Sequence, residues 1–272
     1  MIQWVSKRIA AAAACLAAAA VFLSSCHTKS NNTGQAEPLP YPMTEFYRYA
    51  DSTILTDRFP ESDIYWRDVK VTIDMELPTG KEWEAARNAI ATDPVFGEWL
   101  SGSWLTNMTA LEESAHGFIE RYFDDIAAEN DFSSYDRKDF NTFSYFLRDY
   151  GRFMEPYGNY LCYKRSSVLQ MGHTDCVDIE RYYCFDMMSG RPAEGFIPSG
   201  KNRAKTAGLI RRKLKENPSI LSGNMESIEP SDNCYVSEKG VTFVYEPWQF
   251  SAAGDSSIHV TLSWEELNPY QR

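Results

Sequence analysis

The sequence predicts an α+β fold in which three helices pack on a mostly antiparallel sheet. Residues Val69 to Leu77 alternate between apolar and polar side chains, which predicts a half-buried strand that Pro78 ends. From about Phe143 onward, aromatic and β-branched residues fill three consecutive segments with turn sequences between them. These segments predict a three-stranded central meander with strands at residues 143–154, 159–171 and 176–188.

Three segments are predicted to be helical, and two further segments are predicted to close the sheet. The helices are residues 81–91, a longer one that begins near Asn107 or Thr109 and runs to about Ile126, and residues 201–217 before Pro218. The closing strands are residues 241–246 and 258–262. Ser263 and Glu266 have the spacing of a capping box, which predicts a final helical turn.

The N-terminus has the three parts of a secretory signal. Lys7 and Arg8 precede an apolar, alanine-rich run of about 15 residues, shorter than the roughly 20 that a spanning helix needs. The run ends in Leu23-Ser-Ser-Cys26, which resembles the lipobox of bacterial lipoproteins. The resemblance implies that residues 1–25 are removed and that Cys26 carries the lipid. The alternative is an ordinary signal peptide or a retained anchor in which the cysteine occurs by chance.

Residues 26–43 are polar, end in three prolines and predict a flexible tether, so residues 44–272 are expected to be the folded domain. The expected location is the cell envelope, lipid-anchored and facing the periplasm or the cell surface. The chain has 27 Lys and Arg against 38 Asp and Glu, a net charge of −11 that becomes −13 once Lys7 and Arg8 leave with the signal. This acidity argues against nucleic acid as a partner.

Cysteine usage suggests at least one disulfide, because an exported chain meets an oxidising environment. Apart from the cysteines of the signal and the lipobox, four remain: Cys162, Cys176, Cys184 and Cys234. Two pairs among four cysteines allow three connectivities. If the second turn of the meander centres on His173, Cys162 lies opposite Cys184, which favours this pair slightly. A register error of one residue would remove that pairing.

The C-terminal half resembles a known family in its order of elements. The segments that carry the resemblance are Tyr183–Arg191, Gly208–Lys215, Gly240–Phe250, Ala252–Gly254 and Ile258–Leu267. They read as a strand, a turn and a helix, followed by a strand, a proline-aromatic loop, a small-residue turn, a second strand and a short helix. This order resembles the RsiV-like domain, a domain of unknown function named for the ectodomain of an anti-sigma factor that binds lysozyme. Strand Val69–Leu77 resembles the start of that domain, so the likeness covers roughly residues 65–272, with its signature at about 176–272.

The resemblance implies a binding module at the cell envelope whose ligand is a protein such as lysozyme or a cell-wall glycan. The family commonly has a Gly-Gly-Ala-His turn in the meander, whereas this chain has Met171-Gly-His173. A lipid anchor replaces the family's spanning helix, so regulation by lysozyme-triggered cleavage is not carried over.

The sequence holds no recognisable catalytic motif, so we do not predict an enzyme. The alternative is a hydrolase or modifier of cell-wall polysaccharide whose site is invisible in sequence. No cofactor is predicted, and no metal, because His173 and Cys176 lack the second Cys/His pair of a tetrahedral site.

Two surfaces are candidates for binding. Trp248 and Phe250, on the predicted loop that begins at Pro247, suit protein or sugar recognition, although a loop anchor packed into the core is the alternative. The predicted helix at residues 201–217 carries seven cations: Lys201, Arg203, Lys205, Arg211, Arg212, Lys213 and Lys215. We expect these to form a solvated helix face paired with acidic neighbours, the alternative being a docking surface for anionic lipid or polymer.

Overall fold

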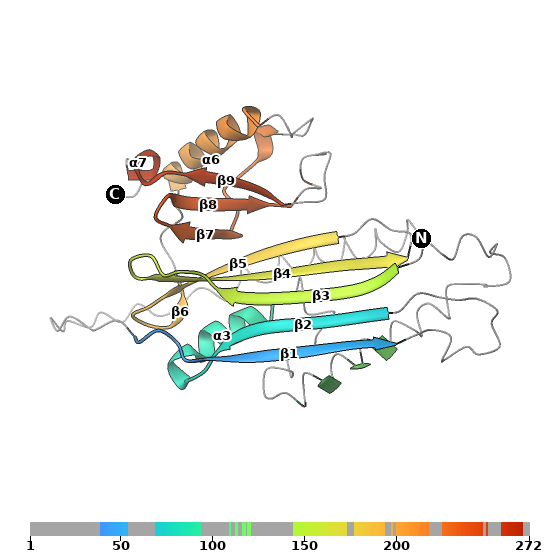
Figure 1. Ribbon diagram of the computed structural model, residues 1–272. Helices are drawn as coiled ribbons and strands as arrows, with labels where there is room; N and C mark the ends of the chain where they lie inside the picture. Colours follow the sequence, from blue (N-terminus) through green and yellow to red (C-terminus); the bar gives the residue numbers. More distant parts are fainter. Residues whose placement is uncertain are drawn as a thin grey trace, which may run out of the picture.

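The described part of the chain forms two sheets, one of six strands and one of three (Figure 1). The computed structural model describes residues 39–53, 69–93, 144–172, 177–193, 200–217, 225–246 and 257–268, with separate positions 109, 112–113, 116–117, 119–120, 197 and 249. The larger sheet has the order β1 (Thr44–Thr53), β2 (Val69–Pro78), β3 (Ser144–Phe153), β4 (Tyr160–Gly172), β5 (Val177–Asp186) and β6 (Arg191–Pro192). The smaller sheet has the order β7 (Cys234–Ser237), β8 (Gly240–Tyr245) and β9 (Ile258–Leu262).

The helical elements lie between and after these strands. They are α3 (Glu84–Ala91) with the 3-10 turn η2 (Lys81–Trp83) before it, α6 (Gly200–Lys215), the 3-10 turn η6 (Met225–Ser227) and α7 (Trp264–Leu267). Two of the three predicted helices correspond to α3 and α6. The predicted helix at 107–126 lies mostly outside the described residues. Its described positions are helical, and Ile119 among them is buried.

The prediction of an α+β fold with a mostly antiparallel sheet is confirmed, but the larger sheet is mixed. The two strands predicted to close that sheet, β8 and β9, belong instead to the separate smaller sheet. Strands β3, β4 and β5 form the predicted antiparallel meander. Strands β2 and β3 pair in parallel, from Val69 opposite Tyr145 to Met75 opposite Gly151. A parallel pair needs a long crossover, and the 65 residues between β2 and β3 provide one.

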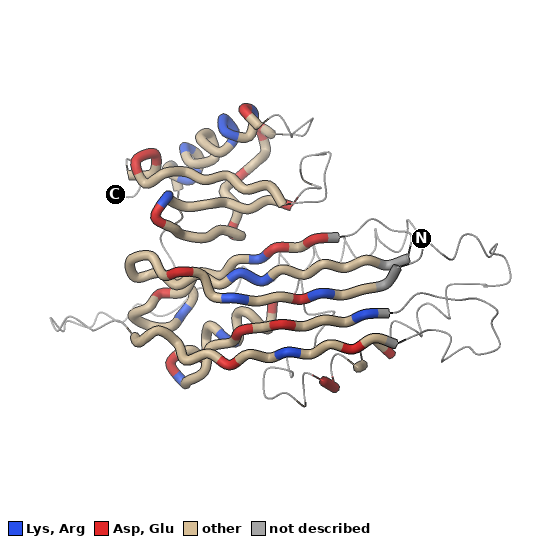
Figure 2. The backbone as a smooth tube through the Cα atoms, viewed as in Figure 1, with Lys and Arg blue, Asp and Glu red and all other residues tan. Residues whose placement is uncertain are grey.

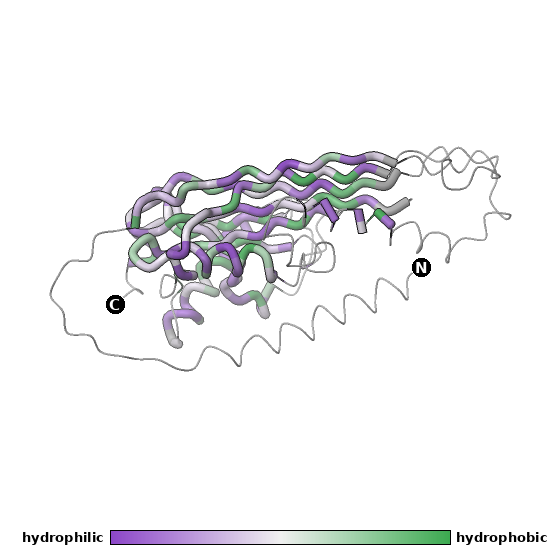
Figure 3. The backbone as a smooth tube through the Cα atoms, turned by 90° about the horizontal axis from the view of Figure 1, so that it is seen from below, coloured by the Kyte–Doolittle hydropathy of each residue, from purple (hydrophilic) through white to green (hydrophobic). Residues whose placement is uncertain are grey.

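One face of the larger sheet is packed against α3. The alternating residues of β2 point inward as predicted, with Val71, Ile73 and Met75 fully buried. Helix α3 buries Ala86 and Ile90 on the same side. In Figure 3 the long strands lie along the upper side of the picture, and the coloured helical segments lie below them.

A buried ion pair links this packed face to α3. The Arg165 guanidinium donates through Nε and Nη2 to the Asp149 carboxylate, and its Nη1 donates 3.0 Å to the carbonyl oxygen of Ile90. Both side chains are at most 2% exposed. Burial works against the charged form of Arg165, but the Asp149 charge outweighs it and keeps the pKa of Arg165 raised. The guanidinium and the carboxylate thus pair with each other inside the core, which offsets part of the cost of burying them.

The smaller sheet has its own core against α6. Every residue of β8 is buried, and Ile210 and Leu214 of α6 pack on the same cluster. The predicted capping box is confirmed at α7, where the Ser263 side chain accepts from the backbone N–H of Glu266 and the Glu266 carboxylate accepts from that of Ser263.

Strands β1, β6 and β7 were not predicted. In β1 Tyr47 is buried, while the large side chains of Phe46 and Arg48 beside it are exposed, so its apolar residues do not alternate with polar ones. Strand β7 has only four residues, too few for a period-2 pattern to stand out.

Candidate binding surface

The loop that the sequence singles out lies almost entirely outside the described residues. Trp248 and Phe250 are not described, so their role in binding stays a prediction. Between them, Gln249 is exposed, and its side-chain oxygen accepts 3.1 Å from the backbone N–H of Glu246 at the end of β8.

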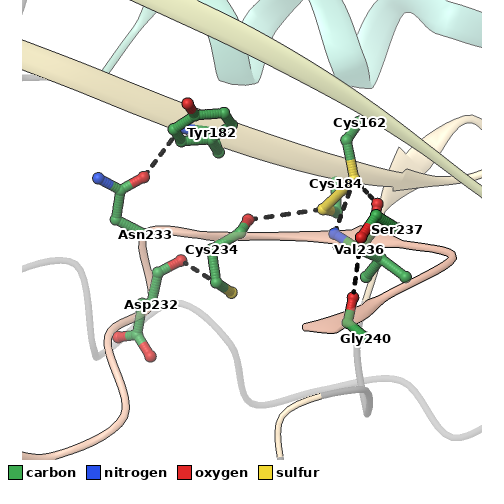
Figure 4. Close-up of a disulfide and its surroundings, with 9 residues drawn as sticks. All are labelled: Cys162, Tyr182, Cys184, Asp232, Asn233, Cys234, Val236, Ser237 and Gly240. Carbon is green, nitrogen blue, oxygen red and sulfur yellow. Dashed lines mark hydrogen bonds between the residues drawn. A yellow bond between two sulfur atoms is a disulfide. The ribbon is translucent and has the colours of Figure 1, made fainter. Parts of the chain in front are cut away.

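The junction between the two sheets holds the disulfide that the spacing favours. Cys162 and Cys184 face each other in the β4–β5 register, with Cα atoms 4.2 Å apart, and form a disulfide (Figure 4). Strand β7 runs beside it: the backbone N–H of Val236 lies 3.4 Å from Cys162 Sγ. Cys234 is a free, buried thiol, and burial raises its pKa to about 12. Cys176 lies outside the described residues.

A network of polar and aromatic side chains also holds the junction together. Glu180 of β5 accepts from His259 of β9 at 2.9 Å and from Lys164 of β4. The His259 hydrogen bond is the main reason that the pKa of Glu180 falls to about 2; partial burial opposes it and Lys164 adds to it. The rings of Tyr182 and Tyr235 stack at 4.6 Å across the same junction. These contacts join the two sheets, and both carboxylate oxygens of Glu180 accept hydrogen bonds in them.

A cavity of about 360 Å³ lies beside this junction, between β5, β6, β7 and α3. Its lining is mainly apolar, including Phe185, Ala193 and the disulfide-bonded Cys184. Asp232 is the one carboxylate among the described residues of that lining. The described residues also hold no group of three or more His, Cys, Asp or Glu side chains arranged for a metal ion.

The predicted cationic helix is α6, and most of its described cations have partners. Arg203 and Arg211 pair with Glu229, and Lys213 pairs with Glu266 at 2.8 Å. This arrangement matches the expectation of a helix face paired with acidic neighbours. Arg212 is more exposed than Arg203, Arg211 and Lys213. Its side chain is 62% accessible, and the Glu266 carboxylate lies 3.9 Å away.

The larger sheet has a second face, which points away from α3. On β1, β2 and β3, large side chains of this face are exposed to solvent. Residues of even number on these strands point to this side, because successive side chains alternate between faces. We call this surface the open face, and it comprises Phe46, Arg48, Asp74, Phe146, Arg148, Tyr150 and Arg152. Phe46 and Tyr150 are 54% and 39% exposed, an unusual position for large aromatic side chains.

Arginines accompany the rings of the open face. Arg48 and Arg152 both lie over the Phe46 ring, with guanidinium carbons 5.7 and 5.6 Å from its centroid. Arg148 lies 4.8 Å from the centroid of Phe146. Such cation–π contacts hold both partners in place. Figure 2 shows basic and acidic residues interspersed along the strands of this sheet.

Asp74 lies between two of these arginines. It accepts from Arg48 Nε at 3.2 Å and from Arg152 Nη2 at 2.5 Å. Partial burial acts against ionisation of Asp74, but the hydrogen bonds and charges of the two arginines outweigh it and lower its pKa. The Asp74 carboxylate thus accepts hydrogen bonds from two guanidinium groups and holds both in place.

Sequence reasoning missed the open face. Its residues come from three strands, two of them neighbours only through the parallel β2–β3 pairing. The available signal was the repeat Phe146-x-Arg148-x-Tyr150-x-Arg152, which places rings and arginines alternately on one face of a strand.

Comparisons with known proteins show the fold. No protein-family model matches the chain, and no curated protein does. The crystal structure of a DUF3298 family member from Bacteroides fragilis superposes with a TM-score of 0.65 at 13% identity, covering 85% of this chain and 94% of that one. A DUF3298 family protein from Pseudomonas aeruginosa matches with a TM-score of 0.48 at 13% identity, over 86% and 95% of the two chains.

The chain therefore shares the fold of a DUF3298 family protein. Among the described residues, no helix combines the length and the apolar character that a membrane span requires.

Proposed function

We propose that this chain is a lipid-anchored binding module of the cell envelope and that it holds a glycan on the open face. The observation that carries the proposal is the exposure of Phe46 and Tyr150 on a face of regular strands. Aromatic rings offer a large apolar area with few rotatable bonds, and strands fix their positions before the ligand arrives. The apolar C–H faces of sugar rings pack on such surfaces.

The anchor gives the module its location. The lipobox ending at Cys26 and the polar tether after it support a domain held near the membrane and able to reach wall material. The anchoring of Cys26 is part of the proposal and is tested separately below.

The test is co-sedimentation of the full chain, in detergent, with purified insoluble cell-wall sacculi. We expect wild type to pellet with the sacculi and the double variant Phe46→Ala/Tyr150→Ala to stay in the supernatant. Tyr41→Ala is the matched control, since Tyr41 is 48% exposed and lies against Phe153, which points to the packed side of the sheet. Wild type that does not pellet, or a double variant that pellets as well as wild type, would refute glycan binding on this face.

Lysozyme is the protein ligand that the sequence resemblance implies, and it forms a second arm of the test. The proposed glycan ligand would be replaced by a protein ligand under three conditions. Binding to lysozyme would have to persist at physiological salt, weaken in Trp248→Ala and stay unchanged in Phe46→Ala. An acidic chain attracts any basic protein at low salt, so binding that vanishes with salt would not count as recognition.

A further inference from the structure

We propose that the ligand of the open face is an acidic polysaccharide, whose carboxylates pair with Arg48 and Arg148 while its sugar rings lie on the aromatic side chains between them. This inference rests on the proposed function and names the class of glycan. It depends on how rings and guanidinium groups are spaced on β3 and on which arginine donors the protein itself leaves unused.

The spacing on β3 repeats a ring and a cation. Phe146, Arg148, Tyr150 and Arg152 follow one another on the same face, each about 6.7 Å from the next and together about 20 Å long. Phe46 and Arg48 continue the pattern on β1, two strands away and so about 10 Å across the sheet. An extended polymer along β3 would meet an apolar ring and a cationic group in alternation, as a chain of charged sugars would require.

The charge on this face favours an anion although the whole chain has a net charge of −11. On β1, β2 and β3 the three arginines share this face with Lys70 and with two carboxylates, Asp74 and Glu76. Asp74 is shared by Arg48 and Arg152, while Glu76 accepts from the backbone N–H of Phe153 at 3.1 Å. Within the described part of the chain, Arg148 lies over the Phe146 ring and pairs with no carboxylate.

Arg48 and Arg148 keep donors for a ligand, whereas Arg152 donates through Nη1 to the carbonyl oxygens of Gly151 and Asp74 and through Nη2 to the Asp74 carboxylate. Arg48 has 71% of its side chain accessible, and its bond to Asp74 uses Nε, so the terminal nitrogens can donate outward. A guanidinium group binds a carboxylate through two parallel N–H···O bonds, which gives both affinity and orientation. The ring contacts and the shared Asp74 hold these groups before binding, which lowers the entropy lost when the ligand orders them.

The experiment compares two forms of one polymer, polygalacturonate and its methyl ester, which have the same sugar backbone and differ in charge. Binding to the full chain in detergent is measured by isothermal titration calorimetry at about 0.15 M salt, the physiological range. We expect polygalacturonate to bind at least about tenfold more tightly than the ester. Arg148→Gln should weaken binding of the acid by about fivefold and leave the ester unchanged, whereas Phe46→Ala should weaken both.

Arg212→Gln is the matched control, because Arg212 has a similarly exposed guanidinium on α6, away from the open face. Equal loss in Arg148→Gln and Arg212→Gln would show general attraction by charge and overturn the inference. Equal affinity for the acid and the ester, lost in Phe46→Ala, would overturn the acidic ligand but leave glycan binding on the open face intact. Failure to bind either polymer, together with failure to pellet with sacculi, would remove the proposed function as well.

Discussion

His259 of β9 and Glu180 of β5 form a hydrogen bond of 2.9 Å that joins the smaller sheet to the larger one. The two residues are 79 positions apart in the chain, and Glu180 is also held by Lys164 on the neighbouring strand. The side chain of Glu180 is 15% exposed and that of His259 is 34% exposed, so the carboxyl group is the more buried partner of the pair. This contact makes the docking of the two sheets sensitive to the ionisation of one carboxyl group.

Glu180→Gln should destabilise the protein at neutral pH by about 1–3 kcal/mol, because hydrogen bonds to a charged group are lost. The folded pKa of Glu180 is lowered from 4.5 to about 2. The stabilisation is therefore complete above pH 4.5 and is lost as the pH falls toward 2. Thermal unfolding of wild type and variant between about pH 2 and pH 7 measures this. A difference in Tm that is as large at the acid end as at neutral pH would show that the charge of Glu180 is not responsible.

Glu246 should make the protein less stable as the pH rises, which is opposite to the effect of Glu180. Burial raises its pKa to about 7, with Arg181 opposing and Glu180 and Asp178 adding to the effect, and its Oε2 is buried without a hydrogen-bond partner among the described residues. The unfolded chain loses this proton near pH 4.5 and the folded one near 7, so stability falls as the pH rises through that interval. Glu246→Gln should raise the free energy of unfolding at about pH 8 by about 1–2 kcal/mol and change little at about pH 4.

The control for this carboxyl group lies three residues further along the chain. Gln249→Ala removes the side-chain hydrogen bond to the backbone N–H of Glu246 and keeps the Glu246 carboxyl group, so the pH dependence of stability should stay as in wild type. Denaturant unfolding at about pH 4, 6 and 8 gives the three free energies for each protein. A Glu246→Gln variant that is less stable than wild type at the alkaline end would contradict the prediction.

The arrangement of the cysteines can be tested by peptide mapping and by alkylation. Peptide mapping without reduction should recover Cys162 linked to Cys184, and Cys234 should resist alkylation until the protein unfolds, since its thiol is buried and its pKa is raised. Replacing both Cys162 and Cys184 by Ala should cost about 2–4 kcal/mol of stability. A free Cys162 thiol in the native protein, or rapid native alkylation of Cys234, would refute this arrangement.

The buried pair of Asp149 and Arg165 should be far more important for stability than its exposed neighbours. Arg165→Met alone leaves the Asp149 charge buried without its partner and should cost about 3–5 kcal/mol. Replacing both residues, Asp149→Leu with Arg165→Met, should recover part of that loss because no charge is left unpaired. Arg148→Gln, one position away on the exposed face, should change the free energy of unfolding by less than about 0.5 kcal/mol in the same denaturant titrations.

The proposed lipid anchor is tested at Cys26, which lies outside the described residues. Cys26→Ala should abolish metabolic labelling with fatty acid and leave the precursor uncleaved or soluble, because the thiol that receives the lipid is gone. Cys15→Ala, in the signal itself, is the control and should be labelled like wild type. A Cys26→Ala protein that is still labelled and membrane-bound would show that the lipobox interpretation is wrong.

The sequence by itself determined the features that depend on local pattern. Alternation of apolar and polar residues located β2, and segments rich in aromatic and β-branched residues with turn sequences between them located the meander β3–β5. A turn centred on His173 favoured Cys162 opposite Cys184, and this pairing is the one in the structure. The spacing of Ser263 and Glu266 located the capping box of α7. In each case the residues that interact lie close in the chain or on adjacent strands, so their geometry follows from the period of the element.

Only the tertiary structure decided which faces of the strands are exposed to solvent and which are covered by other parts of the chain. The parallel pairing of β2 with β3 joins Asp74 to Arg152 and so completes the open face, and no local pattern specifies a partner 78 residues away. Likewise, Arg165 and Arg148 look alike in the sequence, yet one is buried against Asp149 and the other is exposed beside Phe146. The physical reason is that a period-2 pattern assigns residues to faces, whereas long-range packing decides what covers each face.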